Sequence, residues 1–175
     1  GAKVVCTVPN RMTEGYGLNR HGVDRLADAG ARLIVTVDCG VTALDEVRYA
    51  KSKGMEVIVI DHHRIGEALP EAVAVINPQR TDCRRGAEHL CAVGVTFNLC
   101  MALRRHLREI GTFGGGTGPN LLHAMDLVAL GTVADMVPLV EDNRVFVAKG
   151  IEVMAQMRRP GLSALLEVSG ISASK

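Results

Sequence analysis

Apolar positions in the first half of the chain fall into short runs that predict buried β-strands. The clearest run covers residues 55–60, is rich in β-branched side chains and ends abruptly at Asp61-His62-His63. A continuous apolar run of this length is typical of a parallel strand that is covered on both faces. Similar runs predict further strands at residues 4–8, 33–37 and 73–76.

Segments with helical spacing of apolar residues lie between these runs. Residues 19–29 and 42–52 have this spacing, and Gly30 and Gly54 follow them as C-terminal stop signals. Strands and helices thus alternate about every 25 residues, which is the pattern of βαβ units. Further helices are predicted at residues 94–110, 121–130, 143–156 and 162–168. We therefore predict an α/β fold, a parallel β-sheet flanked by helices, with a helical second half.

Composition narrows the class of protein without identifying its function. The chain has 175 residues, of which 47% are hydrophobic. No apolar run approaches the ~18 residues that cross a bilayer, so we expect no membrane association. The net charge of +1 creates no general attraction for nucleic acid, although basic residues can gather in one groove. Five cysteines without CxxC spacing, and the lack of a signal peptide, favour a cytoplasmic protein with reduced thiols.

Polar side chains directly follow the second, third and fourth predicted strands. Asp38 follows the second strand, Asp61, His62 and His63 follow the third, and Asn77 follows the fourth. Right-handed crossovers bring the carboxyl ends of parallel strands to one edge of a sheet, where ligands bind. We therefore expect these side chains to converge on one site. The alternative is a turn that happens to carry histidines.

A carboxylate in the second half of the chain could complete a metal site. Asp135 lies among the apolar residues 131–139, where an unpaired carboxylate needs a metal, a cation or a hydrogen-bond network. With Asp38 and His62 it would supply ligands for Mn²⁺, Mg²⁺, Fe²⁺ or Zn²⁺. A bound metal would supply hydroxide near neutral pH, while His63 could hold a phosphate oxygen or donate a proton. The alternatives are a structural network around Asp135 and a supporting or solvent-facing role for the histidines.

Two further polar residues are interpreted from their surroundings. Arg11 lies in a glycine-rich loop at residues 10–18, and its guanidinium could pair with phosphate, although most surface arginines are only solvated. Asp126 lies within the predicted core helix at residues 121–130. We expect Asp126 to join a hydrogen-bond network rather than to bind a metal.

Asp61-His62-His63 after an apolar strand resembles the signature of the DHH phosphoesterase superfamily. The loop that reads Arg-x-x-Glu-Gly-Tyr-Gly-Leu from Arg11 to Leu18 resembles, more narrowly, the RecJ family of single-strand-specific 5′→3′ DNA exonucleases. The resemblance covers nearly the whole chain. It also rests on residues 9–10, 35–40, 76–78, 126–135 and 143–144.

The resemblance implies a function and a role for each matching residue. It implies hydrolysis of phosphodiester bonds in single-stranded DNA, in repair and recombination, with two Mn²⁺ or Mg²⁺ ions. Asp38 would bridge the ions, and His62 and Asp135 would complete one of them. His63 would act with Asp38 in catalysis by contacting the scissile phosphate, and Asp61 would orient the histidines. Further partners by resemblance are a single-strand-binding protein and a helicase, while the residues expected to bind substrate are His63, Arg11 and Asn77.

The resemblance also predicts the domain organisation. Residues 1–142 would form part of a DHH domain, and residues 143–175 would begin the helix that connects it to the next domain, with a short helix after it. The family's first Asp-x-Asp motif belongs upstream of Gly1, so we expect a fragment that is inactive alone, with activity in the parent protein. Two alternatives stay open: a DHH phosphodiesterase acting on short oligonucleotides or cyclic dinucleotides, and a non-catalytic folded module.

Overall fold

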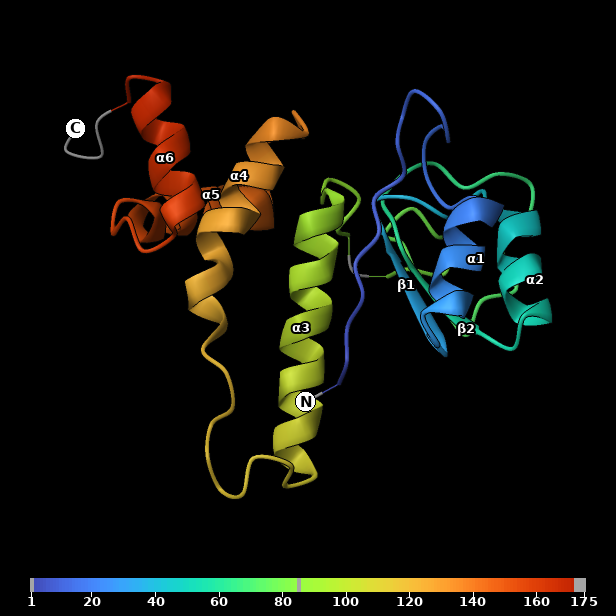
Figure 1. Ribbon diagram of the computed structural model, residues 1–175. Coiled ribbons are helices and arrows are strands. Elements are labelled where there is room, and N and C mark those ends of the chain that lie inside the picture. The colour runs from blue at the N-terminus through green and yellow to red at the C-terminus, as the bar shows by residue number, and fades with distance from the viewer. Residues whose placement is uncertain (1, 85, 172–175) are drawn as a thin grey trace. The chain divides into compact units, whose positions relative to one another are not determined.

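The computed structural model describes residues 2–84 and 86–171, which form two compact units (Figure 1). The first unit extends to Glu88 and the second begins at His89. The described residues contain a three-stranded parallel sheet and six α-helices. The predicted α/β class, with a helical second half, is therefore confirmed.

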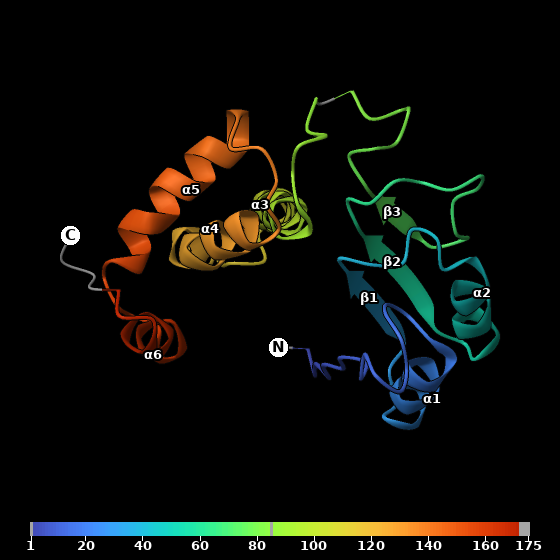
Figure 2. The same ribbon diagram turned by 90° about the horizontal axis from the view of Figure 1, so that it is seen from above.

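The first unit contains the sheet, whose strands lie in the order β1–β2–β3 (Figure 2). All neighbouring strands are parallel, as expected for strands joined through helices. The strands are β1 (Leu33–Val37), β2 (Glu56–Ile60) and β3 (Ala74–Ile76), and the helices are α1 (Arg20–Asp28) and α2 (Leu44–Ser52). These five elements agree with the predicted ranges to within two residues at each end.

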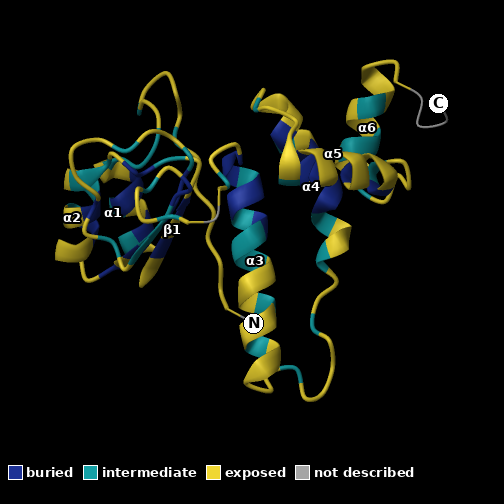
Figure 3. Ribbon diagram, turned by 180° about the vertical axis from the view of Figure 1, so that it is seen from behind, coloured by how far each residue is buried: buried dark blue, intermediate teal, exposed yellow. Residues whose placement is uncertain are grey.

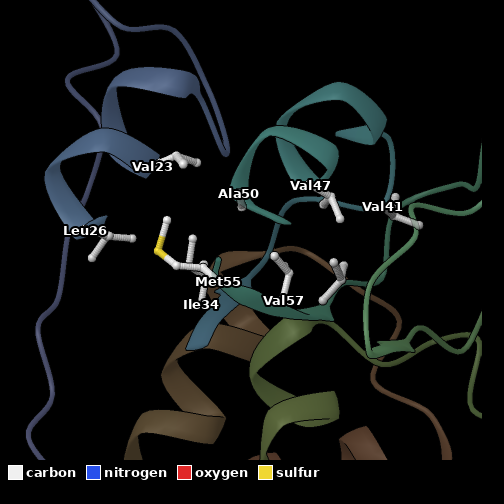
Figure 4. Packing of buried hydrophobic residues seen from close by; sticks show 9 residues of the cluster. Val23, Leu26, Ile34, Val41, Val47, Ala50, Met55 and Val57 are labelled. Atoms are coloured by element: carbon white, nitrogen blue, oxygen red, sulfur yellow. The ribbon is translucent and has the colours of Figure 1, made fainter. Parts of the chain in front are cut away.

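A single apolar cluster joins both helices of the first unit to the sheet (Figure 4). Val23 of α1 and Val47 of α2 are fully buried and lie over the same face of the sheet as Val57. The cluster comprises Val23, Leu26, Ile34, Val41, Val47, Ala50, Met55, Val57 and Val59. Helices α1 and α2 therefore pack on one face of the sheet. The carboxyl ends of the strands continue into loops.

The predicted first strand, residues 4–8, is wrong. Residues 2–10 have no regular secondary structure, and Val4 and Val8 are more than four-fifths exposed. A β-branched run favours extended backbone, but a strand exists only where a neighbour supplies ladder hydrogen bonds. Within the described residues, no strand pairs with this run.

The second unit is helical, as predicted. Its elements are α3 (Ala92–Glu109), the 3₁₀ turn η1 (Leu121–Ala124), α4 (Met125–Ala134), α5 (Glu141–Met154) and α6 (Pro160–Val168). The buried positions of α3 lie in its first half (Figure 3). There Phe97 packs edge to face on Phe146 of α5, with ring centroids 5.5 Å apart. No helix in the described part of the chain is long and apolar enough to span a bilayer.

Helices α4 and α5 cross closely because Gly150 leaves room at the contact. A β-carbon at Gly150 would collide with the side chain of Ala129 and the carbonyl oxygen of Met125. The backbone of α4 at Met125 cannot move away from an added β-carbon without separating the two helices.

Gly150→Ala should therefore lower the free energy of unfolding by about 1–3 kcal/mol. Gly161→Ala in α6 is the matched control, because a β-carbon there meets nothing within 4 Å. Its expected effect is neutral to slightly stabilising, since alanine favours helix over glycine. Urea unfolding of the 175-residue chain measures both variants, and equal stability of the two would contradict the close crossing.

Candidate metal centre

Three potential ligand side chains lie together at the carboxyl edge of the sheet. Asp38 follows β1, and His62 and His63 follow β2, whose last residues pair as Val37 with Ile60. Ligand atoms of these three side chains all lie within 4.8 Å of one another. Nε2 of His62 lies 3.2 Å from Oδ1 of Asp38. The predicted grouping of Asp38 with the two histidines is therefore present.

The donor set of this cluster fits a divalent metal such as Mn²⁺. It offers carboxylate oxygen and imidazole nitrogen, which suit borderline and hard divalent ions. The Asp38 side chain is 52% exposed, so its carboxylate is accessible to an ion from solvent. Cys39 lies beside it, but burial and the charges of Asp61 and Asp38 raise the pKa of that thiol. A protonated thiol is a poor ligand, which leaves oxygen and nitrogen as the donors.

The backbone turns sharply after β1 to present Asp38. The φ angle of Asp38 is +65°, a left-handed conformation that costs about 1 kcal/mol for a residue other than glycine. Gly40 follows with φ +107°, and a β-carbon there would lie 2.7 Å from Oγ1 of Thr36. Such strain is common where a side chain must be aimed at a site.

The Asp61 carboxylate lies beneath the histidines and organises them. It is 1% exposed and accepts from the backbone N–H of Val41 at 3.0 Å, of His62 at 2.8 Å and of His63 at 3.2 Å. It also lies 2.7 Å from Nδ1 of His63. Because an ionised carboxylate only accepts, Nδ1 of His63 carries the hydrogen, and Nε2 is the nitrogen that can contact metal or phosphate.

The charge state of Asp61 follows from its surroundings. Burial alone would raise the pKa of the Asp61 carboxyl, but the hydrogen bonds from Val41, His63 and His62 outweigh burial and lower that pKa. Asp61 is therefore ionised at neutral pH and holds His63 by a charge-assisted hydrogen bond.

Asn77, at the end of β3, holds the backbone of His63. Its side chain is 4% exposed, and its Nδ2 donates to the carbonyl oxygen of His63 at 2.9 Å. Its Oδ1 accepts from the backbone N–H of Gln79 at 2.8 Å. The ends of β1, β2 and β3 thus converge as expected. Both polar atoms of the Asn77 amide are hydrogen-bonded within the protein.

Arg11 reaches this cluster through Tyr16. The Arg11 guanidinium lies 5.4 Å from the centroid of the Tyr16 ring, and the Tyr16 hydroxyl donates to the carbonyl oxygen of Asp38. The ring of Tyr16 also lies edge-on to His63, with centroids 6.4 Å apart. Burial, followed by the charge of Asp38, raises the pKa of Tyr16, so its hydroxyl remains a donor. The sequence pattern did not predict a role for Tyr16. Gly15 and Gly17 on either side of it are the signal that could have indicated one, because both adopt positive φ angles in the loop that carries Tyr16.

Asp135 belongs to the second unit, and its surroundings differ from those expected. It is the C-terminal cap of α4 and is exposed, because the backbone turns away at Met136 with φ +58°. The expectation of a carboxylate deep in apolar surroundings is therefore wrong. The buried carboxylate of this unit is Asp126, which is 3% exposed and accepts from Nε of Arg159 at 2.7 Å, in agreement with its predicted network role.

Comparison with known proteins identifies the family. Residues 1–132 match the family described as "DHH family, N-terminal domain". The chain belongs to the DHH family. It is 48% identical over 171 residues to the protein named single-stranded-DNA-specific exonuclease RecJ of Escherichia coli strain K12, a match that covers 96% of this chain but 30% of that protein. It is 37% identical to the RecJ of Thermus thermophilus, and this match covers 97% of this chain and 24% of that protein. The chain thus spans less than a third of the length of these relatives.

Solved structures show the same relationship within the DHH family. A crystal structure of exonuclease RecJ bound to manganese matches with a TM-score of 0.79 and 34% identity, over 96% of this chain and 40% of the other. RecJ from Thermus thermophilus in complex with Mn²⁺ matches with a TM-score of 0.70 and 33% identity, over 87% of this chain and 22% of the other. The resemblance to the DHH superfamily and to RecJ is confirmed in sequence and in fold.

Asp61→Asn should lower the free energy of unfolding by about 1–3 kcal/mol, because the new amide group would face the N–H of Val41. The folded-state pKa of Asp61 is lowered, so its stabilisation is present above the unfolded pKa of about 4 and is lost as pH falls through the folded pKa. The gap between wild type and variant should therefore be widest at neutral pH and shrink below about pH 4. Urea unfolding across this pH range tests it, with the exposed Asp45→Asn as control; a gap independent of pH would contradict it.

Proposed function

We propose that this chain is part of an exonuclease that hydrolyses phosphodiester bonds in single-stranded DNA in the 5′→3′ direction. The observation that supports it most is the cluster of Asp38, His62 and His63 at the carboxyl edge of the sheet, in a chain whose relatives are named single-stranded-DNA-specific exonucleases. Such a site combines metal ligands with an imidazole that can contact phosphate.

Asp38, His62 and Asp135 would hold the metal, two Mn²⁺ or Mg²⁺ ions, with Asp38 contributing to both. Bound metal would supply hydroxide near neutral pH and neutralise charge on the phosphate. His63 would contact the scissile phosphate through Nε2, because Asp61 engages its Nδ1. Asp61 would keep both histidines oriented through their backbone N–H groups.

Arg11 and Asn77 would serve the substrate in different ways. Arg11 is exposed beside Tyr16, and its guanidinium could pair with a backbone phosphate of the DNA. Asn77 was predicted to bind substrate, and that contact stays a prediction. Its two observed hydrogen bonds support a positioning role through the backbone of His63.

The wider context of the protein is proposed from the resemblance to the RecJ family. We propose that it acts in DNA repair and recombination in the cytoplasm, alongside a single-strand-binding protein and a helicase. We also propose that residues 1–142 form the DHH portion and that residues 143–175 lead to the next domain. Within that proposal, α5 would begin the connection.

Two other functions make different predictions from the same site. A DHH phosphodiesterase for short substrates would cleave dinucleotides or cyclic dinucleotides faster than long strands. A non-catalytic module would bind without turnover. Incubating the full-length protein and Mn²⁺ with a long single-stranded DNA and with dinucleotides, at equal phosphodiester concentration, separates the three outcomes. We expect the long strand to be degraded and its duplex form to resist.

Asp38→Asn and His62→Ala should each reduce turnover of the full-length protein by at least about a thousandfold, because each removes a ligand of the metal that activates water. The fold should be preserved, since both side chains lie at the edge of the sheet rather than in the apolar cluster. Asp45→Asn, which removes an exposed carboxylate from α2, is the matched control and should retain full activity. Activity retained in both site variants would remove Asp38 and His62 from the site.

Asp135→Asn separates a ligand from a structural carboxylate. Asp135 is exposed, so the variant should unfold at the same urea concentration as wild type. If Asp135 binds metal, the affinity of the full-length protein for Mn²⁺ should fall by about tenfold or more. Calorimetric titration with Mn²⁺ measures this directly, and unchanged affinity would exclude Asp135 as a ligand.

A further inference from the structure

The loop that carries Arg11 and Tyr16 is attached to the first unit at two points. At the first, the Tyr16 hydroxyl donates to the carbonyl oxygen of Asp38. At the second, the carboxylate of Glu14 forms an ion pair with Arg25 of α1. The second attachment involves none of the residues of the candidate metal centre, so it acts on the loop.

The Glu14 side chain also closes the turn from which Arg11 projects. Its Oε2 accepts from the backbone N–H of Asn10 at 2.6 Å, and the backbone N–H of Glu14 donates to the carbonyl oxygen of Asn10 at 2.7 Å. Arg25 in addition contacts Oγ1 of Thr7 at 3.3 Å. The Glu14 carboxylate therefore adds to the backbone hydrogen bonds that close the turn at residues 10–14, and it joins this turn to α1.

The part of the loop around Tyr16 has little packing to hold it in place. Gly15 has φ +80° and Gly17 has φ +85°, so the backbone on either side of Tyr16 has the conformational freedom of glycine. Tyr16 is 59% exposed, which means that apolar packing contributes little to its position. Side-chain hydrogen bonds must supply the order that packing does not.

The pair of Glu14 and Arg25 is better placed to do this than an ordinary surface ion pair. The Glu14 side chain is 13% exposed, whereas both partners of the Asp45–Arg48 pair on α2 are more than three-fifths exposed. Partial removal from solvent strengthens a charge-assisted hydrogen bond. The hydrogen bond from Arg25, followed by that from the Asn10 N–H, lowers the pKa of Glu14, so its carboxylate is ionised at neutral pH.

We propose that Glu14 and Arg25 are positioning residues that latch the turn at residues 10–14 onto α1 and so hold Arg11 beside the metal centre for binding of the DNA phosphate. The proposal rests on the proposed function. Without the latch, the loop occupies other conformations, and substrate affinity falls in proportion to the fraction of molecules with Arg11 in place. Asp38 and His62 follow the carboxyl ends of β1 and β2, so they keep their geometry when the loop moves. The latch therefore affects KM and leaves kcat and Mn²⁺ affinity unchanged.

The test uses Glu14→Gln and Arg25→Gln in the full-length, Mn²⁺-loaded protein acting on single-stranded DNA. We expect KM to rise about fivefold in each variant, with kcat unchanged. Lys51→Gln is the control, because it removes an ordinary exposed ion pair, with Glu71, from α2 and should change neither constant. Arg25→Lys retains the charge and should recover part of the KM effect.

Two further measurements separate a latch from a general structural effect. In an Arg11→Gln background, Glu14→Gln should raise KM no further, because the latch acts through Arg11. Backbone amides of residues 11–18 should exchange hydrogen faster in both latch variants, with unchanged exchange in β2. Unchanged loop exchange, a full additional rise in KM without Arg11, or a loss confined to kcat would each overturn the proposal.

The same experiments distinguish failure of the latch from failure of the proposed function. If the wild-type protein does not degrade single-stranded DNA, the proposed function fails and the effect on substrate fails with it. Loop exchange then decides whether the ion pair orders the loop. If the wild type is active and the loop loosens without a rise in KM, the positioning role alone is overturned.

Discussion

The buried carboxylate of Asp61 is the interaction on which the geometry of the metal centre depends. A charge that is 1% exposed is costly unless it is well hydrogen-bonded. Asp61 meets that condition with N–H groups from the loop after β1 and from the end of β2. The bonds that make the buried charge tolerable also fix the backbone at His62 and His63 and orient the ring of His63. Stability and site geometry therefore depend on the same side chain.

The parallel topology of the sheet is the second feature that determines the geometry of the site. Because β1, β2 and β3 run in the same direction, the residues that follow them leave the sheet at one edge. Register places Val37 opposite Ile60 and Ile60 opposite Ile76, so Asp38, Asp61 and Asn77 follow at equivalent heights. Asp38, His62 and His63, the candidate ligands, are thus brought together by backbone hydrogen bonds, with side-chain bonds adding orientation.

Sequence patterns predicted the features that depend on local periodicity and on topology. The strands at β1 and β2, the helices and the convergence of Asp38, His62 and His63 all follow from runs, spacing and the crossover rule. The run at residues 4–8 has the same local pattern but no ladder partner among the described residues, so pattern alone misled. Asp135 was judged by its apolar neighbours in sequence, whereas the end of α4 exposes it. Burial depends on where a helix ends and on what packs against it, which a list of neighbours does not contain.

Contacts between residues that are distant in the sequence could not be predicted from local patterns. Tyr16 meets Asp38 across 22 positions and Glu14 meets Arg25 across 11, and neither pair has a periodic signature. These contacts mean that two parts of the site differ in how rigidly they are held. Asp38 and His62 lie just after the ends of β1 and β2, so moving them requires disruption of the sheet and core. The loop with Arg11 is held largely by side-chain hydrogen bonds and can open at lower free energy. A substitution in the loop can therefore weaken substrate binding without altering the candidate metal centre. A substitution at Asp61 alters both the candidate metal centre and the stability of the fold.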